Sequence, residues 1–451
     1  MFLNTKIDIP KISNQNYILV LALFNGAILM NFHTLIMKNH LLLALMISLV
    51  TITIIDYKNW WATIANSIIS IYLLINEFPR IGNHATLILG ISLLLVVLYL
   101  LKTFSIKTKI RPAFIPYLFR TVLATVYFYA GFHKLNTDFF NSCVSCVNGI
   151  NSYILSNFIN SSINLTAKWS TLLQYATIIL EMIVPFGLFW PTTRKYTAFI
   201  LLFFHFYLSF SVFADFCSLA LFLIIGCLHD FDAKTIHPKV KNALKIYLLF
   251  AILAIASQYF MSYLYIIKYP MHFYKGLLYN IGFLYFVVVY FKNYKIKKNH
   301  FQKKYYSYLI PIVIFISIWT LKTYIGLGNA GNLTMFSNLV TEKSKSNHLL
   351  IDTKKTKIFD FEEDFVEIIS LDNPSARESF VGFRIPVVEF KYMIQNSANK
   401  SNQPLPCILR YKNKLFKIDD LKKSEFNTAK WWYKYLNFRK IQINGANECR
   451  W

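Results

Sequence analysis

The sequence predicts an all-α polytopic membrane bundle of about 9–11 transmembrane helices, followed by a small extracytoplasmic α+β domain at the C-terminus. Three observations predict this class. Of the 451 residues, 55% are hydrophobic and 17% are aromatic, and the mean hydropathy of +0.42 is far above that of a soluble protein. Long apolar runs recur up to residue 325. The remainder holds 20 basic and 14 acidic residues, and none of its runs is long enough to cross a bilayer.

Eleven apolar runs are candidate membrane spans, because a helix needs about 20 apolar residues to cross the hydrocarbon core. The runs are residues 17–36, 41–55, 60–76, 85–101, 116–133, 172–190, 197–213, 216–228, 243–267, 276–291 and 306–325. Three of them, 41–55, 60–76 and 216–228, are short. These three fit tilted or re-entrant segments as well as full spans. The predicted number of transmembrane helices is therefore given as about 9–11.

The distribution of basic residues predicts the orientation. Lys and Arg gather in alternate loops, at residues 102–111, 194–195, 234–241 and 292–304. By the positive-inside rule these loops are cytoplasmic, so the N-terminus is cytoplasmic and the loop 134–170 is external. The net charge of +25 then reflects topology and contact with lipid headgroups, and we expect no nucleic-acid partner.

Two domains are predicted, a multi-pass domain over residues 1–325 and an external domain over residues 326–451. In the external domain, four runs are strand-like and one suits a helix. The strand-like runs are 358–371, 381–394, 407–418 and 438–443, and the helical run is 422–436. A modest mixed sheet with one helix is therefore expected.

The cysteines do not predict a metal site, because Cys143 and Cys146 have no second ligand pair at a suitable spacing. In an external loop this pair is more often a small disulfide or two free thiols. Cys407 and Cys449 could form another disulfide if their compartment is oxidising. The sequence leaves both pairings open.

Lys134 is the first candidate for chemistry. It falls at the outer end of the span 116–133, about 21 Å along the helix from Arg120 at 1.5 Å per residue. Partial desolvation there would disfavour the charged form and leave some free amine, which a general base or nucleophile requires. By position alone, an interfacial lysine that extends toward water is the more common case. His133 faces another side of the helix and is a weaker candidate.

Glu181 and His205 are the second pair of candidates, because ionisable groups inside a membrane are costly and are usually retained for a function. Each lies near the middle of its predicted span, so the two could share one layer of the bundle. A hydrogen-bonded structural pair and a role in proton transfer are equally open interpretations. Arg120, near the inner end of its span, is more typical of an anchor for lipid phosphate or of a helix partner.

The stretch 331–351, directly outside the last span, is rich in polar side chains. It includes Asn338, Glu342, Asn347 and His348. Such a density of donors and acceptors could cap a cavity near Lys134. An ordinary ordered turn that leads into the external domain is the more common case.

These residues resemble a known membrane domain. The segments FRTVLATVYFYAGFHKLNTDFF and LEMIVPFGLFWPTTRKYTAFILLFFHFYLSFSVFADF are similar to the domain shared by vitamin K-dependent gamma-carboxylase and its bacterial relatives, the horizontally transferred transmembrane domain. The resemblance covers roughly residues 10–325. Its most specific parts are the Arg at the start of the span, the AG-x-x-Lys-Leu turn, the Glu-x-x-x-Pro helix and the helix that carries the His. The bacterial type implies an inner-membrane location.

The resemblance implies a role for each matching residue. In the carboxylase, the lysine of the Lys-Leu turn is thought to deprotonate a reduced quinone, whose oxygenation drives carboxylation of substrate glutamate. That lysine corresponds to Lys134, and the helix histidine corresponds to His205. Two positions depart from the pattern, because His133 replaces a lysine and Asn136 replaces an aspartate. The external domain is also much shorter than the carboxylase's luminal region, and fold kinship does not by itself imply the same reaction.

The leading hypothesis is a quinone-linked membrane enzyme of the lyase type, with carboxylase or epoxidase activity. Lys134 would be the base, with Glu181 and His205 lining the pocket. The expected cofactor-binding residues are Tyr127, Phe128, Phe204 and Arg120, the cofactor is a reduced quinone, and no metal is predicted. The expected partners are the bilayer, the lipid quinone and a polypeptide substrate or membrane partner. The alternative is a non-catalytic protein that transports a small solute or lipid, or that serves another protein.

Overall fold

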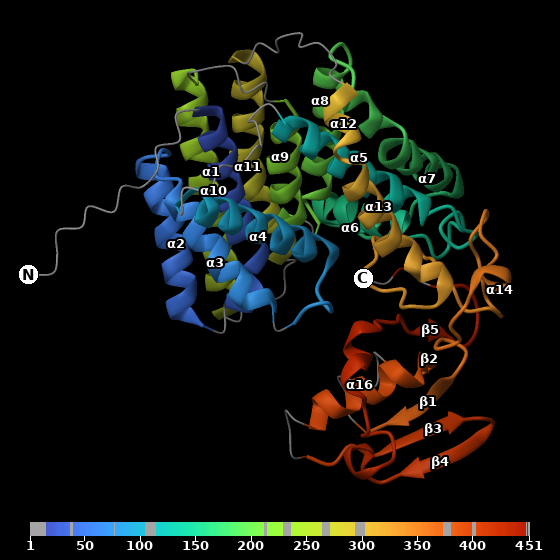
Figure 1. The fold of residues 1–451 in the computed structure, drawn as a ribbon. Helices are drawn as coiled ribbons and strands as arrows, with labels where there is room; N and C mark the ends of the chain where they lie inside the picture. Colours follow the sequence, from blue (N-terminus) through green and yellow to red (C-terminus); the bar gives the residue numbers. More distant parts are fainter. Residues whose placement is uncertain are drawn as a thin grey trace, which may run out of the picture.

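The computed structural model consists of a helical bundle and a smaller body that contains a β-sheet (Figure 1). The name smaller body refers here to the described residues after Ile325. It describes residues 15–36, 39–75, 77–103, 114–211, 214–228, 236–263, 271–293, 303–372, 380–398, 403–447 and 449. Seven of the fifteen basic residues that predict the orientation fall in 104–113, 229–235 and 294–302, outside the described residues.

Each of the eleven apolar runs forms a helix. The helices are α1 (Gln15–Ile36), α2 (His40–Ile55), α3 (Trp61–Ile75), α4 (Asn83–Thr103), α5 (Ile115–Phe132), α7 (Ala167–Met182), α8 (Arg194–Leu208), α9 (Ala214–Leu228), α10 (Pro238–Tyr263), α11 (Met271–Asn293) and α13 (Ile310–Leu321). Two further helices, α6 (Cys146–Ile159) and α12 (Lys303–Ser307), lie in segments expected to be loops.

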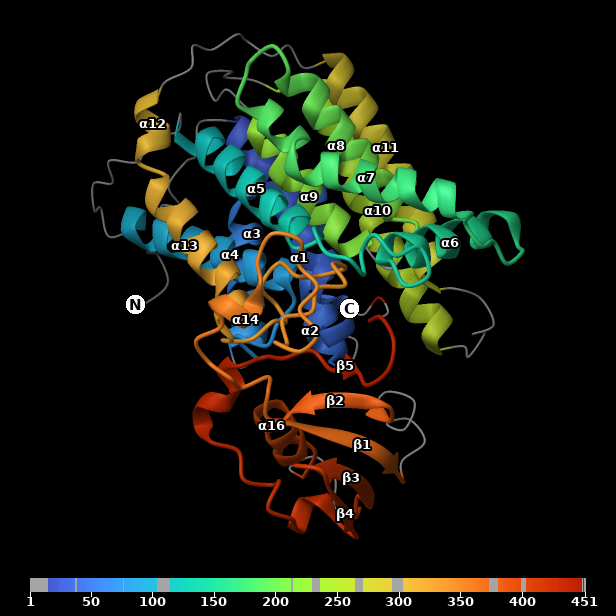
Figure 2. The same ribbon diagram turned by 90° about the vertical axis from the view of Figure 1, so that its right-hand side faces the viewer.

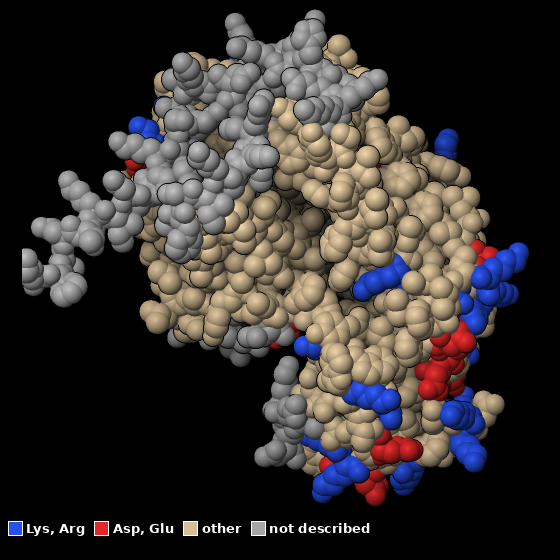
Figure 3. All heavy atoms as spheres, in the orientation of Figure 1, with Lys and Arg blue, Asp and Glu red and all other residues tan. Residues whose placement is uncertain are grey.

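Five helical segments are long and apolar enough to cross a membrane, judged by length and composition over the described residues. They are Asn83–Leu101, Ala167–Leu188, Pro238–Phe260, Phe273–Asn293 and Tyr305–Ile325. Figure 3 shows that charged side chains are sparse on the visible face of the bundle and gather on the smaller body. Together these features suggest an integral membrane protein.

Helix α9 lies at the centre of the bundle. It packs against α1, α5 and α8, and nearly every side chain from Cys217 to Leu228 is buried. A helix that is surrounded by others needs apolar residues on all its faces, which explains the run SLALFLIIGCL. The short length of this run therefore fits a central helix that other helices enclose.

The smaller body contains a five-stranded sheet in the order β4-β3-β1-β2-β5. The strands are β1 (Phe365–Leu371), β2 (Phe383–Pro386), β3 (Cys407–Tyr411), β4 (Lys414–Ile418) and β5 (Ile441–Gln442). Every pairing is antiparallel, so the prediction of a mixed sheet was wrong. In Figures 1 and 2, β5 is the strand nearest the bundle and β4 is the farthest. A two-residue turn explains the antiparallel pairing of β3 and β4, which are joined through Lys412 and Asn413, both with positive φ.

Two secondary-structure predictions in this body were wrong. The second half of the expected strand 381–394 is helix α16 (Val387–Ala398), because Val387, Phe390 and Ile394 follow the helical spacing and face the sheet core. The expected helix 422–436 instead contains two short 3₁₀ turns, η4 (Leu421–Lys423) and η5 (Trp431–Tyr435). Between them, Asn427 donates to the Lys422 carbonyl oxygen, and such side-chain bonds to the backbone compete with a helix.

The smaller body is attached to one end of the bundle by specific polar contacts. Arg80, between α3 and α4, binds Glu389 of α16 through two nitrogens, at 2.6 and 3.0 Å. Asn136, just after α5, forms a bridge with His348. These contacts join the bundle to α16 and to the segment around His348.

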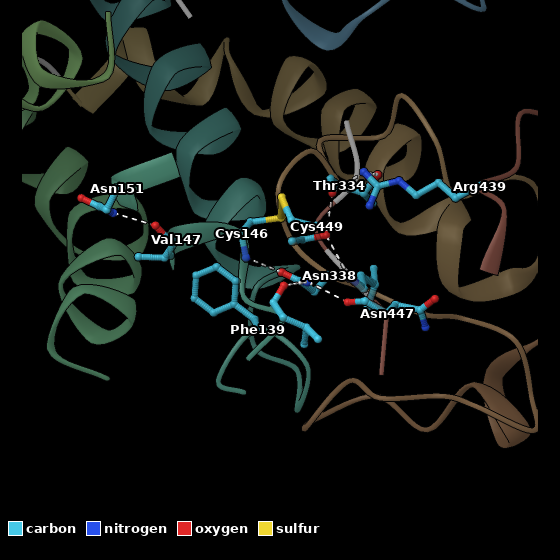
Figure 4. The surroundings of a disulfide bond; sticks show 12 residues. Phe139, Cys146, Val147, Asn151, Thr334, Asn338, Arg439, Asn447 and Cys449 are labelled. Atoms are coloured by element: carbon cyan, nitrogen blue, oxygen red, sulfur yellow. Dashed lines mark hydrogen bonds between the residues drawn. A yellow bond between two sulfur atoms is a disulfide. The ribbon is translucent and has the colours of Figure 1, made fainter. Parts of the chain in front are cut away.

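A disulfide also joins the two bodies, between Cys146 at the start of α6 and Cys449 near the C-terminus (Figure 4). Neither pairing considered from the sequence forms, because Cys143 is free and exposed and Cys407 is free and buried. The bonded cysteines are 303 residues apart, so only the docking of the smaller body brings them together.

Candidate functional site

A cavity of about 330 Å³ lies at the end of the bundle that faces the smaller body. Its walls come from α4 to α9, and residues after α13 also contribute. The side chains that line it are Asn83, His84, Leu87, Val126, Tyr127, Ala130, Lys134, Phe139, Cys146, Val147, Ile150, Asn151, Leu173, Ala176, Thr177, Leu180, Glu181, Ile200, Phe203, Phe204, His205, Tyr207, Leu208, Phe216, Leu333, Met335 and Phe336. Most of these are apolar, as is typical of a site for a small hydrophobic molecule.

Lys134 lies in the wall of this cavity, two residues beyond the end of α5. Its Nζ donates to the Ala130 carbonyl oxygen at 3.1 Å and lies 2.7 Å from Oε2 of Glu181. Only 5% of the lysine side chain is exposed. The amine is therefore buried and paired, rather than extended toward water as an interfacial lysine would be.

The close approach of α5 and α7 positions Glu181. A Cβ atom at Gly131 would lie 2.5 Å from the Met182 side chain and 3.1 Å from that of Glu181, so a larger residue would push the helices apart. After Met182 the chain tightens into the 3₁₀ helix η2 (Val184–Leu188). The α-helix ends shortly before Pro185, because proline lacks the N–H group that an α-helix needs. Glu181 thus lies in the last turn of α7, and not at the middle of a helix.

Tyr127 and His205 form a second polar pair in the same cavity. The tyrosine hydroxyl group hydrogen-bonds to Nε2 of His205, which is fully buried. Nδ1 of the histidine lies 3.8 Å from Sγ of Cys217 on α9. Glu181 and His205 are therefore not paired with each other, since each is paired with a residue of the α5 region.

The two pairs line the same cavity, with Tyr127 on α5 and Lys134 two residues beyond its end. The spacing of seven residues between Tyr127 and Lys134 is visible in the sequence. It did not reveal that Glu181 and His205 are the partners.

The stretch 331–351 does cap the cavity, but with different residues from those expected. Leu333, Met335 and Phe336 line it. Leu333 and Phe336 have positive φ angles of 60° and 57°, a backbone conformation that bulky residues rarely adopt. Strained turns of this kind concentrate at functional sites.

The polar residues of this stretch hold the cap in place. Asn338 accepts a hydrogen bond from the Cys146 backbone N–H and donates to the carbonyl oxygens of Val144 and Asn447 (Figure 4). Asn347 donates to the Asn338 carbonyl oxygen. Glu342 binds Arg384 in the smaller body.

His348 docks on the end of α5. Its Nε2 is 3.0 Å from the Phe132 carbonyl oxygen, and its Nδ1 accepts the backbone N–H groups of Leu350 and Ile351. This pattern requires the neutral imidazole with the proton on Nε2. Burial lowers the pKa of His348, and the hydrogen bond to Phe132 opposes this shift. His133 is also buried, and its Nδ1 contacts the Tyr324 hydroxyl group at 2.8 Å.

Two residues expected to bind a cofactor do not line this cavity. Phe128 lies on another face of α5 and lines a groove between α5, η2 and α13. Arg120 lies toward the start of α5, where its Nε donates to the Cys227 carbonyl oxygen of α9 at 2.9 Å. Arg120 is therefore a helix partner in this structure, while Tyr127 and Phe204 share the cavity with Lys134.

Other lining residues had not been expected. His84 and Asn83 come from the start of α4, and Asn151 comes from α6. The spacing of Val147, Ile150 and Ile154 indicates an amphipathic helix and could have predicted α6. Among the described residues, no group of three or more His, Cys, Asp or Glu side chains could hold a metal ion. Comparisons with protein-family models, curated proteins and solved structures found no match to this chain.

Proposed function

We propose that this protein is an integral membrane enzyme that uses the Lys134–Glu181 pair as the base in quinol-linked chemistry. One observation carries the proposal: the buried ion pair lies in the wall of the apolar cavity that also contains the Tyr127–His205 pair. A charged pair is costly to bury, and a pair that only stabilised the fold would not need to line a cavity.

The pair can accept a proton without changing the net charge of the cavity. When a hydroxyl group of the bound molecule gives its proton to the Glu181 carboxylate, the Lys134 ammonium group pairs with the resulting oxyanion. One ion pair replaces another, so no isolated charge is created in a medium of low dielectric constant. Lys134 thus acts together with Glu181, rather than as a free amine.

The residues present fit a reduced quinone. Phe203, Phe204 and Tyr127 offer aromatic walls for its ring, and the ion pair can receive its hydroxyl proton. A reduced quinone, when bound, supplies an acidic hydroxyl group and reducing electrons. The Tyr127–His205 pair provides a second polar contact in the same cavity. Carboxylation of a polypeptide glutamate rests on the family resemblance alone.

The proposed topology has nine to eleven spans, with the cavity at the outer face of a bacterial inner membrane and the smaller body outside. The Cys146–Cys449 disulfide supports this orientation, because disulfides persist in oxidising compartments. In this arrangement a lipid quinone would reach the cavity from the bilayer, and a polypeptide substrate would reach it from water.

The test is the oxygen-dependent consumption of vitamin K1 quinol by the purified protein in nanodiscs, with the epoxide and quinone quantified by chromatography. Lys134→Ala should lower the rate about 100-fold or more, the usual effect of losing a general base. Lys168→Ala is the matched control, because that lysine is exposed at the start of α7 and does not line the cavity. Equal rates for wild type and Lys134→Ala would reject the proposal.

Transport of a small solute is the second candidate, and one observation favours it. Lys275 of α11, which is buried, forms an ion pair with the partly exposed Asp215 of α9, so charged pairs in the bundle are not confined to the cavity. Transport predicts that proteoliposomes move a solute and that no quinol is consumed.

A further inference from the structure

One short segment of the smaller body leaves two pairs of large apolar side chains exposed. Leu349 and Leu350 are 54% and 69% exposed, and Ile358 and Phe359 are 70% and 38% exposed. Lys357, directly before Ile358, is buried and pairs with Glu362 and Glu363 at 2.5 and 2.8 Å. Large apolar side chains that gather on a surface in this way mark a contact with a membrane or a partner.

The segment is fixed at the level where the helices of the bundle end. The backbone N–H of Leu349 donates to the Leu135 carbonyl oxygen, directly beyond α5. The N–H groups of Ile358 and Phe359 both donate to the Ile325 carbonyl oxygen, at the end of the 3₁₀ helix η3 (Lys322–Ile325) that follows α13. Figures 1 and 2 both place α14 (Thr353–Thr356), the middle of this segment, between the bundle and the sheet.

Gly326 permits the close contact between the end of η3 and the backbone of Phe359. Gly326 has a φ of +88°, and a Cβ atom there would lie 2.0 Å from the Phe359 carbonyl oxygen. Only glycine allows the chain after η3 to turn and touch the backbone of Phe359. Ile358 and Phe359 are thus held against the end of the last helix of the bundle.

The exposed apolar side chains continue the outer surface of α13. On that helix Ile314, Phe315 and Ile318 are more than half exposed, in a run apolar enough to span a membrane. Two lysines of α14, Lys354 and Lys355, are exposed between the two apolar pairs Leu349–Leu350 and Ile358–Phe359. Apolar side chains flanked by lysines are characteristic of segments that lie in a membrane interface.

We propose that Leu349–Leu350 and Ile358–Phe359 insert into the adjacent leaflet of the bilayer and seat the smaller body on the membrane surface. The partner is the lipid itself, at the boundary between headgroups and acyl chains. Lys354 and Lys355 remain among the headgroups. This proposal concerns how the smaller body is held over the cavity, and it does not depend on the reaction.

Nitroxide labels on the full-length protein in phosphatidylcholine bilayers test the proposal. Leu350→Cys and Ile358→Cys are labelled separately in a Cys143→Ser background, because Cys143 is free and exposed. Both labels should collide more often with oxygen, which concentrates in lipid, than with a water-soluble nickel chelate. Leu415→Cys is the matched control, since Leu415 is 66% exposed on β4, the strand farthest from the bundle. Its label should show the reverse preference.

Two results would overturn the proposal. Labels at 350 and 358 that behave like the label at 415 would place the segment in water. Labels shielded from both reagents would show that a protein surface covers the segment instead. Using two positions guards against one substitution that disturbs folding, and thermal unfolding of each labelled variant checks this.

Discussion

Two buried lysine–glutamate clusters in this protein have similar chemistry and different surroundings. In the bundle, Lys134 and Glu181 lie in the wall of a cavity. In the smaller body, Lys357 is paired with Glu362 and Glu363 and is sealed, with no exposed side-chain surface. Thr341 also donates to both carboxylate oxygens of Glu362. A charge pair is available for chemistry only where a molecule can reach it.

The sealed cluster should therefore give the largest effect on stability. In Lys357→Met, the buried Glu362 carboxylate and the partly exposed Glu363 carboxylate lose their cation, which should lower the free energy of unfolding by about 3–5 kcal/mol. Denaturant titration of the full-length protein measures this. Lys343→Met removes an ion pair with the exposed Asp360 and should cost less than about 1 kcal/mol. Similar losses in both variants would show that burial does not make the Lys357 cluster more important for stability than an exposed ion pair.

The cavity cluster should give the largest effect on activity. Glu181→Gln keeps the shape of the side chain but cannot accept a proton, so vitamin K1 quinol turnover should fall about 100-fold. Glu362→Gln, which also removes a buried carboxylate charge, should leave the rate per folded molecule unchanged. An equal fall in both variants would show that the effect on the rate comes from stability.

Gly131→Ala tests whether helix packing sets the geometry of the cavity pair. The added methyl group would clash with Met182 and push α7 away, at a cost of about 1–3 kcal/mol in stability. Because Lys134 and Glu181 would separate, the rate should also fall, by about tenfold. Gly149→Ala is the control, since a Cβ atom there meets no atom within 4 Å. A normal rate in Gly131→Ala would show that the pair tolerates displacement.

The smallest expected effect is a pH dependence from His348. Burial lowers its pKa in the folded state, so below the ordinary value of about 6.5 the unfolded chain binds a proton that the folded chain does not. Stability should therefore fall as the pH drops from 7.5 to 5.5. The fall should be larger in wild type than in His348→Gln, as measured by thermal unfolding at both pH values. Parallel pH profiles would contradict this account.

Much of the architecture could be predicted from the sequence, because burial in a membrane or a bundle core needs continuous apolar runs. All eleven runs contain a helix, and every described strand falls after residue 325, where the composition changes. The ionisable residues Lys134, Glu181 and His205 also stood out, since such groups are rare in apolar segments. These are properties of single positions or local patterns, which a sequence displays directly.

The partners of these residues were decided by the tertiary structure. The pairing of Lys134 with Glu181 depends on Gly131, and that of Tyr127 with His205 depends on how α5 and α8 each pack against α9. The Cys146–Cys449 disulfide and the cap formed by Leu333 and Phe336 join segments that are hundreds of residues apart. A sequence records which side chains are present and their local period. Contacts across such separations arise only when packing fixes the relative positions of helices, so no local pattern could have revealed them.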